Sequence, residues 1–174
     1  MSPTRHIALV GPMGAGKSRV GALLAARLGL PFVDADAALE AACGRRIAAL
    51  FKAEGEEAFR DRETVMLREL LMAPRSVIAT GGGVVLREDN RALLRAHAIV
   101  VHLHADVATQ LQRLDGCRDR PLLQAPDVEQ RLRQLAGQRD PLYASVRDQM
   151  IDTCGRSPEQ VCDALVEAPE MRAS

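Results

Sequence analysis

Short apolar runs alternate with segments of helical periodicity along this chain. The first run covers residues 7–10, and the next segment, residues 17 to about 27, repeats apolar side chains every three or four positions. Such an alternation predicts an α/β domain in which a parallel five-stranded sheet is covered by helices on both faces. The remaining apolar runs that we interpret as strands are residues 32–33, 76–80, 98–103 and 150–152.

A longer helical segment separates the second run from the third. It covers about residues 35–73 and is interrupted at Gly44 and Gly55, so we expect three shorter helices. The last of these carries Arg60 and Glu63, which lie one helical turn apart and can therefore touch. Because the segment is too long for a simple crossover helix, it indicates a helical insertion that holds an acceptor substrate.

Helices are also predicted in the second half of the chain. Apolar spacing favours helices over residues 87–95 and 107–114. Asp127 is a suitable N-cap for a further helix that ends near Arg139, and Ser157-Pro158 is a typical opening for the final helix.

Length and element order indicate one domain. No linker or internal repeat divides the 174 residues, so we expect a single domain, 1–174, with its core over residues 6–166. Residues 168–174 are expected to form a disordered tail.

A glycine-rich motif lies between the first apolar run and the first helix. Residues 11–18 match the pattern G-x-x-x-x-G-K-[ST] at every fixed position. In this strand-to-helix context, backbone N–H groups curl around a phosphate, Lys17 reaches the β- and γ-phosphates, and the Ser18 hydroxyl ligates Mg²⁺. The motif therefore predicts binding of ATP or GTP, with contacts from Gly14, Ala15, Gly16, Lys17 and Ser18.

Two further groups of candidate site residues follow strands. Asp34 and Asp36 end the second predicted strand, and they would face the phosphate loop because ligands gather at the carboxyl ends of parallel strands. One of them could also cap the next helix. Gly81, Gly82 and Gly83 follow the third strand, where three glycines favour a backbone that passes very close to a ligand over a plain turn.

A charged, aperiodic stretch at about residues 115–124 interrupts the pattern. It is typical of a mobile loop, and mobile charged loops act as lids in phosphoryl-transfer enzymes. An ordinary exposed loop would have the same composition, so the lid interpretation needs further support. His102 and His104 share one strand face, and without a third ligand in view we interpret them as structural.

The composition of the chain argues against a nucleic-acid-binding protein and against a membrane protein. The chain carries 23 basic and 23 acidic side chains and only 2% aromatic residues, so neither a basic surface nor a stacking platform for nucleic acid is indicated. No apolar run is long enough to span a bilayer, and the N-terminus lacks the features of a signal peptide. The four cysteines form no C-x-x-C pair. We therefore expect a cytoplasmic protein that binds neither nucleic acid nor a membrane.

Taken together, the motifs closely resemble the shikimate kinase family, a nucleoside-monophosphate-kinase-like branch of the P-loop folds. The resemblance extends from His6 to about Val166. The phosphate-loop motif alone is shared by many activities, whereas the combination is specific. In chain order the motifs are Gly-Pro-Met-Gly-Ala-Gly-Lys-Ser (11–18), Phe-Val-Asp-Ala-Asp (32–36), Glu-Ala-Phe-Arg (57–60), Thr-Gly-Gly-Gly (80–83), Arg-Pro-Leu-Leu (120–123) and Arg-Asp-Pro-Leu-Tyr (139–143).

The resemblance implies transfer of the ATP γ-phosphoryl group to the 3-hydroxyl of shikimate, with Mg²⁺, by a monomer. It also implies a three-layer P-loop fold with strand order 2-3-1-4-5. Catalysis would fall to Lys17, Asp36 and the lid residue Arg120. The other implied contacts are Asp36, Arg60, Gly82 and Arg139 for shikimate, with Gly81 and Gly83 beside them; Ser18 and Asp34 for Mg²⁺; and Arg113, Arg120 and Pro158 for the nucleotide.

One residue departs from the family pattern. Arg19, which we also place at the nucleotide, stands where Thr is usual after the metal-binding Ser. Because Ser18 supplies the metal hydroxyl, we expect little loss of function, although the local phosphate contacts could differ.

The chemistry suits shikimate, which has one carboxylate and three hydroxyls. Arg60 and Arg139 can hold a carboxylate in a forked geometry, and Asp36 can orient the nucleophilic hydroxyl. Two alternatives stay open. A gluconate kinase of the same fold would also bind a polyhydroxy carboxylate, and a nucleotide-sensing module would bind ATP without turnover. A sensor needs no acceptor site, which argues against the second.

Overall fold

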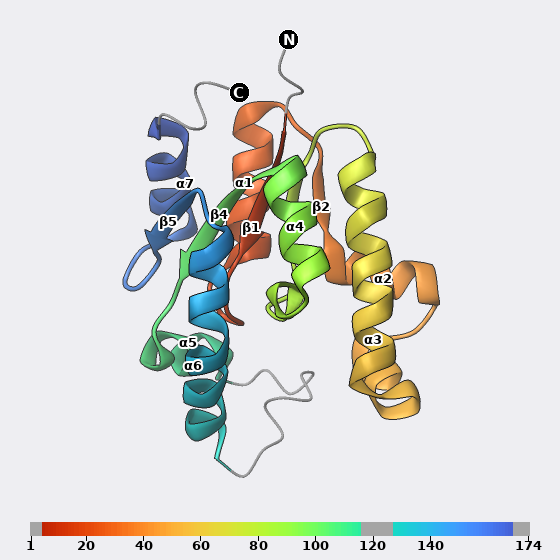
Figure 1. Ribbon diagram of the computed structural model, residues 1–174. Coiled ribbons are helices and arrows are strands. Elements are labelled where there is room, and N and C mark those ends of the chain that lie inside the picture. Colours follow the sequence, from red (N-terminus) through yellow and green to blue (C-terminus); the bar gives the residue numbers. More distant parts are fainter. Residues whose placement is uncertain (1–4, 116–126, 169–174) are drawn as a thin grey trace.

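A computed structural model describes residues 5–115 and 127–168 of the chain. Five parallel strands form one sheet in the order β2-β3-β1-β4-β5, as predicted (Figure 1). Their bounds are β1 (His6–Val10), β2 (Phe32–Asp34), β3 (Val77–Ala79), β4 (Ala98–His104) and β5 (Gln149–Asp152).

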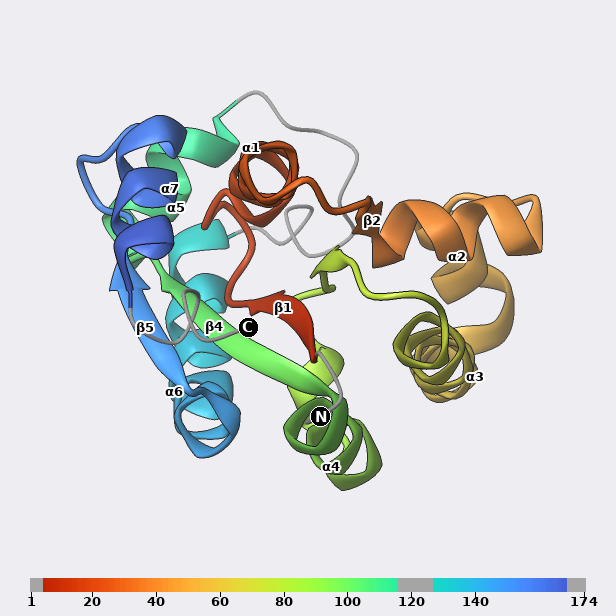
Figure 2. The ribbon, with the colours of Figure 1, turned by 90° about the horizontal axis from the view of Figure 1, so that it is seen from above.

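Helices cover both faces of the sheet because alternate strand residues point to opposite sides. Leu9 of β1 belongs to an apolar cluster with helices α1 (Lys17–Leu28) and α7 (Pro158–Glu167). Its neighbours Ala8 and Val10 belong to a second cluster, which is covered by α3 (Ile47–Met72), α4 (Glu88–His97) and α6 (Val128–Val146). Figure 2 shows these two helical layers with the sheet between them.

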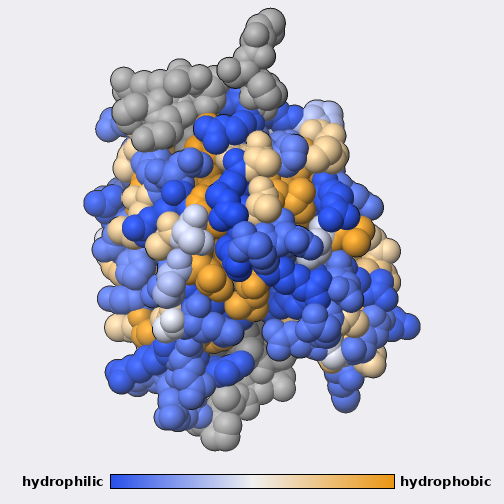
Figure 3. Space-filling view, in the orientation of Figure 1, coloured by the Kyte–Doolittle hydropathy of each residue, from blue (hydrophilic) through white to orange (hydrophobic). Residues whose placement is uncertain are grey.

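The outer faces of the helices are polar. On the face seen in Figure 3, polar side chains cover most of the surface and apolar side chains are visible mainly between the helices. This is the pattern expected when each helix buries one apolar stripe against the sheet. Among the helices within residues 5–115 and 127–168, we find none that is both long and apolar enough to cross a membrane.

The predicted helical insertion follows β2. It consists of α2 (Ala35–Cys43) and the first half of α3, which share a small apolar core of Leu39, Leu50 and Phe59. Both predicted interruptions are present. Gly44 ends α2 with φ 62°, and Gly55, at φ 84° and ψ 173°, breaks α3 into two helical pieces. The second piece continues onto the sheet, where Leu67 and Leu71 join the core.

One helix extends further than its sequence predicts. Proline normally disrupts a helix interior, so we expected the helix after Asp127 to end near Arg139. In the structure α6 instead continues through Pro141 to Val146. Its last turn is held by Tyr143 and Val146, which are 0% and 4% exposed. The extra turn places Tyr143 four residues after Arg139 and therefore on the same helix face.

A further short helix, α5 (Val107–Leu114), follows β4 and covers the predicted residues. Asp106 caps it by accepting a hydrogen bond from the Thr109 backbone N–H at 2.7 Å. The predicted lid at residues 115–124 follows α5, and all of it after Asp115, including Arg120, lies outside the described residues. The predicted disordered tail is likewise outside them from residue 169 onward.

Candidate active site

The candidate site lies at the carboxyl edge of the sheet, where the loop after β1 meets the residues after β2 and β3. Gly11 opens the phosphate loop with φ 146°. A Cβ atom at this position would lie 2.2 Å from the backbone oxygen of Leu103 on β4. Only glycine fits this close approach, which explains the first fixed position of the motif.

Side chains hold four successive carbonyl groups of the phosphate loop. Lys17 Nζ donates to the oxygens of Gly11 and Pro12 at 2.8 and 2.9 Å. From α5, Gln110 Nε2 donates to the Met13 oxygen at 2.8 Å, and Arg113 Nη1 donates to the Gly14 oxygen at 2.9 Å. Since the C=O and N–H groups of one peptide unit point in opposite directions, these bonds also fix the directions of the loop N–H groups.

Gln110 was not predicted as a site residue. Its side chain is only 3% exposed, and it lies one helical turn before Arg113 on α5. The sequence around a glutamine in a short helix does not show which backbone carbonyl group its side chain will contact. Only the packing of α5 beside the loop identifies it.

Asp34 contacts both the phosphate loop helix and α2. One carboxylate oxygen accepts a hydrogen bond from the Ser18 hydroxyl, and the other accepts from the Ala37 backbone N–H at 3.1 Å. Asp34 is therefore the N-cap of α2 while it faces Ser18. A hydroxyl and a carboxylate oxygen are hard ligands, so this pair suits Mg²⁺, which takes one or two carboxylates and keeps several waters.

Asp36 lies on the other side of the same turn, facing Glu63 and the glycine run. A Cβ atom on Gly81 would lie 2.9 Å from Asp36 Oδ1 and 3.0 Å from Glu63 Oε1, so both carboxylates face this glycine. Burial raises the pKa of Glu63, and the nearby Asp36 charge adds to the effect, while Arg60 opposes it. The two carboxylates therefore form an acidic cluster beside the glycine run.

Two buried arginines lie against the same glycine run. Arg60 comes from α3 and Arg139 from α6, and each is 8% exposed. A Cβ atom on Gly83 would lie 2.4 Å from Arg60 Nη1, and one on Gly82 would lie 3.4 Å from Arg139 Nη1. The glycines therefore make room for both guanidinium groups.

The environment of these arginines suits an anion. Arg60 Nη1 donates to Glu63 Oε2 at 2.8 Å, and its guanidinium lies over the Phe59 ring, 5.1 Å from the ring centroid. Burial lowers the pKa of Arg139, and the positive charge of Arg60 lowers it further. In both arginines the buried Nε atom lacks a hydrogen-bond partner among the described residues. A carboxylate placed between the two guanidiniums could accept hydrogen bonds from both.

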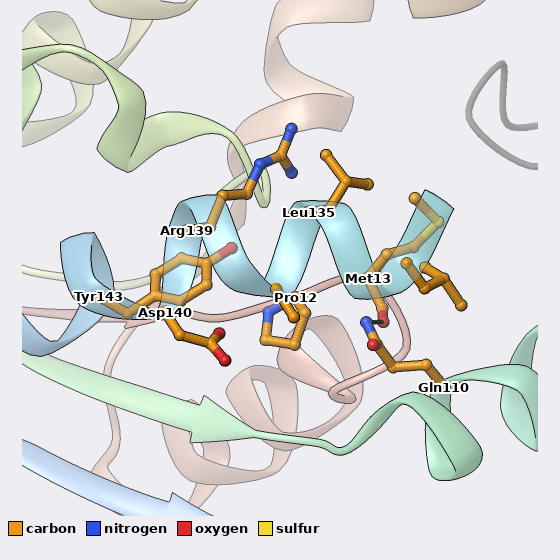
Figure 4. Close-up of a pocket in the computed structure, with 9 residues that line it drawn as sticks. Pro12, Met13, Gln110, Leu135, Arg139, Asp140 and Tyr143 are labelled. Carbon is orange, nitrogen blue, oxygen red and sulfur yellow. Dashed lines mark hydrogen bonds between the residues drawn. The ribbon is translucent and has the colours of Figure 1, made fainter. Parts of the chain in front are cut away.

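The two arginines and the phosphate loop lie on adjacent sides of Gly82 and Gly83. Gly82 lies close to the loop, since a Cβ atom there would be 3.4 Å from the Gly11 oxygen and 3.7 Å from the Met13 nitrogen. Figure 4 shows Arg139 and Tyr143 on α6 beside Pro12 and Met13 of the loop, with Gln110 below. An acceptor held at Arg139 would therefore lie next to a phosphate held in the loop.

Of the residues predicted at the nucleotide, Arg113 contacts the other end of the loop. Arg113 donates from Nη2 to the Thr153 oxygen at 2.6 Å and from Nη1 to Thr153 Oγ1 at 2.9 Å. Pro158, the first residue of α7, follows the same connection and is half-buried. Arg19 is exposed on the first turn of α1. Arg113 thus ties the phosphate loop to the segment that leads to Pro158.

Comparisons with known proteins agree with this geometry. A family model described as shikimate kinase matches residues 13–170. A shikimate kinase from Chromohalobacter salexigens is 51% identical over 160 residues, covering 92% of this chain and 89% of that protein. One from Pseudomonas aeruginosa is 49% identical over 162 residues, covering 93% and 94%. A solved structure of shikimate kinase from Acinetobacter baumannii in complex with shikimate has a TM-score of 0.92 at 43% identity, covering 95% and 92%.

Proposed function

The chain belongs to the shikimate kinase family, and from this premise we propose that it transfers the γ-phosphoryl group of ATP to the 3-hydroxyl of shikimate. The observation that carries the proposal is the pair of buried guanidiniums beside the phosphate loop. This arrangement offers a carboxylate site and a phosphate site in contact with each other. The products would be ADP and shikimate 3-phosphate, and the latter is an intermediate of aromatic amino acid biosynthesis.

Substrate capture follows from the charged side chains around the glycine run. Arg60 and Arg139 would hold the carboxylate, because planar guanidiniums match its geometry. Glu63 keeps Arg60 in place through the 2.8 Å bond described above. Asp36, which faces Gly81 beside Glu63, would accept a hydrogen bond from the ring hydroxyls and draw the proton from the one that attacks.

Phosphoryl transfer is mainly a matter of position and charge. Lys17 would move from the loop carbonyls to the β- and γ-phosphates of bound ATP, and the loop N–H groups would surround them. Ser18 and Asp34 would hold Mg²⁺, which neutralises charge on the transferring group when bound. By the family resemblance, Arg113 and Pro158 would flank adenine, and Arg120 of the lid would add a positive charge near the phosphates.

We further propose that the protein is a cytoplasmic monomer, as is usual in the family. Light scattering would test its oligomeric state.

The direct test is ADP release measured with ATP, Mg²⁺ and either shikimate, gluconate or no acceptor. We expect release to depend on shikimate. Release with gluconate alone would identify a sugar-acid kinase instead. ATP binding without release in any of the three reactions would indicate a nucleotide-sensing module.

The two aspartates are predicted to serve different ligands. Asp34→Asn should raise the Mg²⁺ concentration needed for half-maximal rate, and excess Mg²⁺ should partly restore the rate, because one cation-facing charge is lost. Asparagine remains a good N-cap, so α2 should be preserved. Asp36→Asn should lower turnover by roughly 10²-fold or more, the usual scale for a positioned acid–base group, without rescue by metal.

The measurement is a Mg²⁺ titration of both variants at saturating ATP and shikimate. ATP affinity should stay near normal in Asp36→Asn. If excess Mg²⁺ restores Asp36→Asn and not Asp34→Asn, the two roles are exchanged. Rescue of both variants, or of neither, would contradict the assignment.

Gly83→Ala should weaken shikimate binding selectively. The new Cβ atom would collide with Arg60 Nη1, whose position is fixed by Glu63, so the guanidinium must leave the carboxylate site. We expect the KM for shikimate to rise roughly tenfold, on the scale of one hydrogen bond to a charged group, with little change in the KM for ATP.

The matched control is Gly137→Ala on α6, where a Cβ atom meets nothing within 4 Å. Steady-state kinetics of both variants would test the prediction. An unchanged KM for shikimate in Gly83→Ala would show that Arg60 does not contact the substrate.

A further inference from the structure

Tyr143 is the single tyrosine of the chain, and it stands beside the carboxylate site without facing solvent. It lies one turn after Arg139 on α6 and is 0% exposed. We propose that Tyr143 is a positioning residue that sets the separation and direction of the two guanidiniums that receive the substrate carboxylate. This inference rests on the proposed function, because that function makes the shikimate carboxylate the common ligand of Arg60 and Arg139.

The first connection runs to Arg139. Arg139 and Tyr143 lie one turn apart on the same face of α6, and their side chains line the same cavity. Burial raises the pKa of Tyr143 well above its usual value, so the hydroxyl keeps its proton at neutral pH. It can therefore accept from Arg139 through a lone pair and still donate its own hydrogen elsewhere.

The second connection runs to Arg60 through the glycine run. The Tyr143 hydroxyl donates to the Gly82 carbonyl oxygen at 2.5 Å. That carbonyl belongs to the peptide unit that joins Gly82 to Gly83, and the other end of this unit packs against Arg60 Nη1 and Nη2. One phenol thus fixes the peptide unit whose two glycines lie against Arg139 and Arg60.

The ring that carries this hydroxyl is itself held in place. Its centroid lies 4.8 Å from that of the His102 imidazole, at an interplanar angle of 32°. His102 is 2% exposed on β4, and burial lowers its pKa to about 4, so it stays neutral beside the ring. A buried phenol that packs from α6 onto β4 has little freedom to rotate, which suits a positioning role.

The test is Tyr143→Phe, which removes only the hydroxyl and keeps the ring packing. We expect the KM for shikimate to rise roughly tenfold, because the guanidiniums lose their common anchor. The KM for ATP and kcat should stay within about twofold of the parent values, since the phosphate loop bonds of Lys17, Gln110 and Arg113 do not involve Tyr143.

The matched control is Ser76→Ala, which removes another buried hydroxyl. Ser76 Oγ lies 3.2 Å from His6 Nδ1 before β3, at the opposite edge of the sheet from the site. Both variants should lose similar thermal stability, but only Tyr143→Phe should change the KM for shikimate. This split separates positioning from a general loss of packing.

Three outcomes would overturn the inference. An unchanged KM for shikimate in Tyr143→Phe would show that the hydroxyl has no effect on substrate capture. An equal rise in both KM values, or the same rise in Ser76→Ala, would indicate only a structural role. If the parent protein does not phosphorylate shikimate at all, the proposed function fails and this inference fails with it, whereas the first two outcomes leave the proposed function intact.

Discussion

Replacing Lys17 by alanine is expected to lower kcat by roughly 10²–10³-fold, the scale of losing one donor that stabilises transition-state charge. The ammonium group would lie where charge develops between the β- and γ-phosphates. In the structure its Nζ atom instead donates to the loop oxygens of Gly11 and Pro12. The same side chain therefore also supports the loop, so part of the loss should appear as weaker ATP binding.

The other lysine of the chain provides a matched control. Lys52 lies exposed on α3, so Lys52→Ala removes the same charge from the surface. Circular dichroism and ADP-release kinetics of both variants would test the prediction. A folded Lys17→Ala protein that keeps more than about a tenth of the parent rate would contradict phosphoryl transfer at this loop.

Arg139→Ala and Arg60→Ala should each raise the KM for shikimate far more than the KM for ATP. Removing one partner of a desolvated charge pair costs about 2–5 kcal/mol, or about 30- to 5,000-fold in affinity. Both guanidiniums are buried next to the glycine run, so water can replace the missing contact only poorly. Arg60→Lys should also bind poorly, because an ammonium group cannot present two parallel donors.

Arg133→Ala is the appropriate control for Arg139→Ala. Arg133 lies on the same helix, but its side chain is 70% exposed and pairs with Glu129 at the surface. Kinetics with each substrate varied in turn would distinguish the two sides of the site. Equal effects on ATP and shikimate in the Arg60 and Arg139 variants would place these arginines at the nucleotide.

Local sequence signals determined the elements and the phosphate loop. Apolar runs gave the strands, and the caps at Asp127 and Ser157 gave two helix starts, because a cap depends on bonds within three residues. The interruptions at Gly44 and Gly55 were equally local, since each glycine has a positive φ. The loop motif could be predicted for the same reason: a strand, a tight turn and a helix start are adjacent in sequence.

Only the tertiary structure decided which distant residues form one site. The sequence pattern alone could not show that Arg60 and Arg139 both lie against the glycine run, and the resemblance supplied that pairing before the fold did. Their meeting depends on the order of the strands and on how α3 and α6 pack against the sheet. Gln110 and Tyr143 were missed because their partners are backbone oxygens 97 and 61 residues away. Such contacts depend on long-range packing, which also carries α6 through Pro141 and so brings Tyr143 to Gly82.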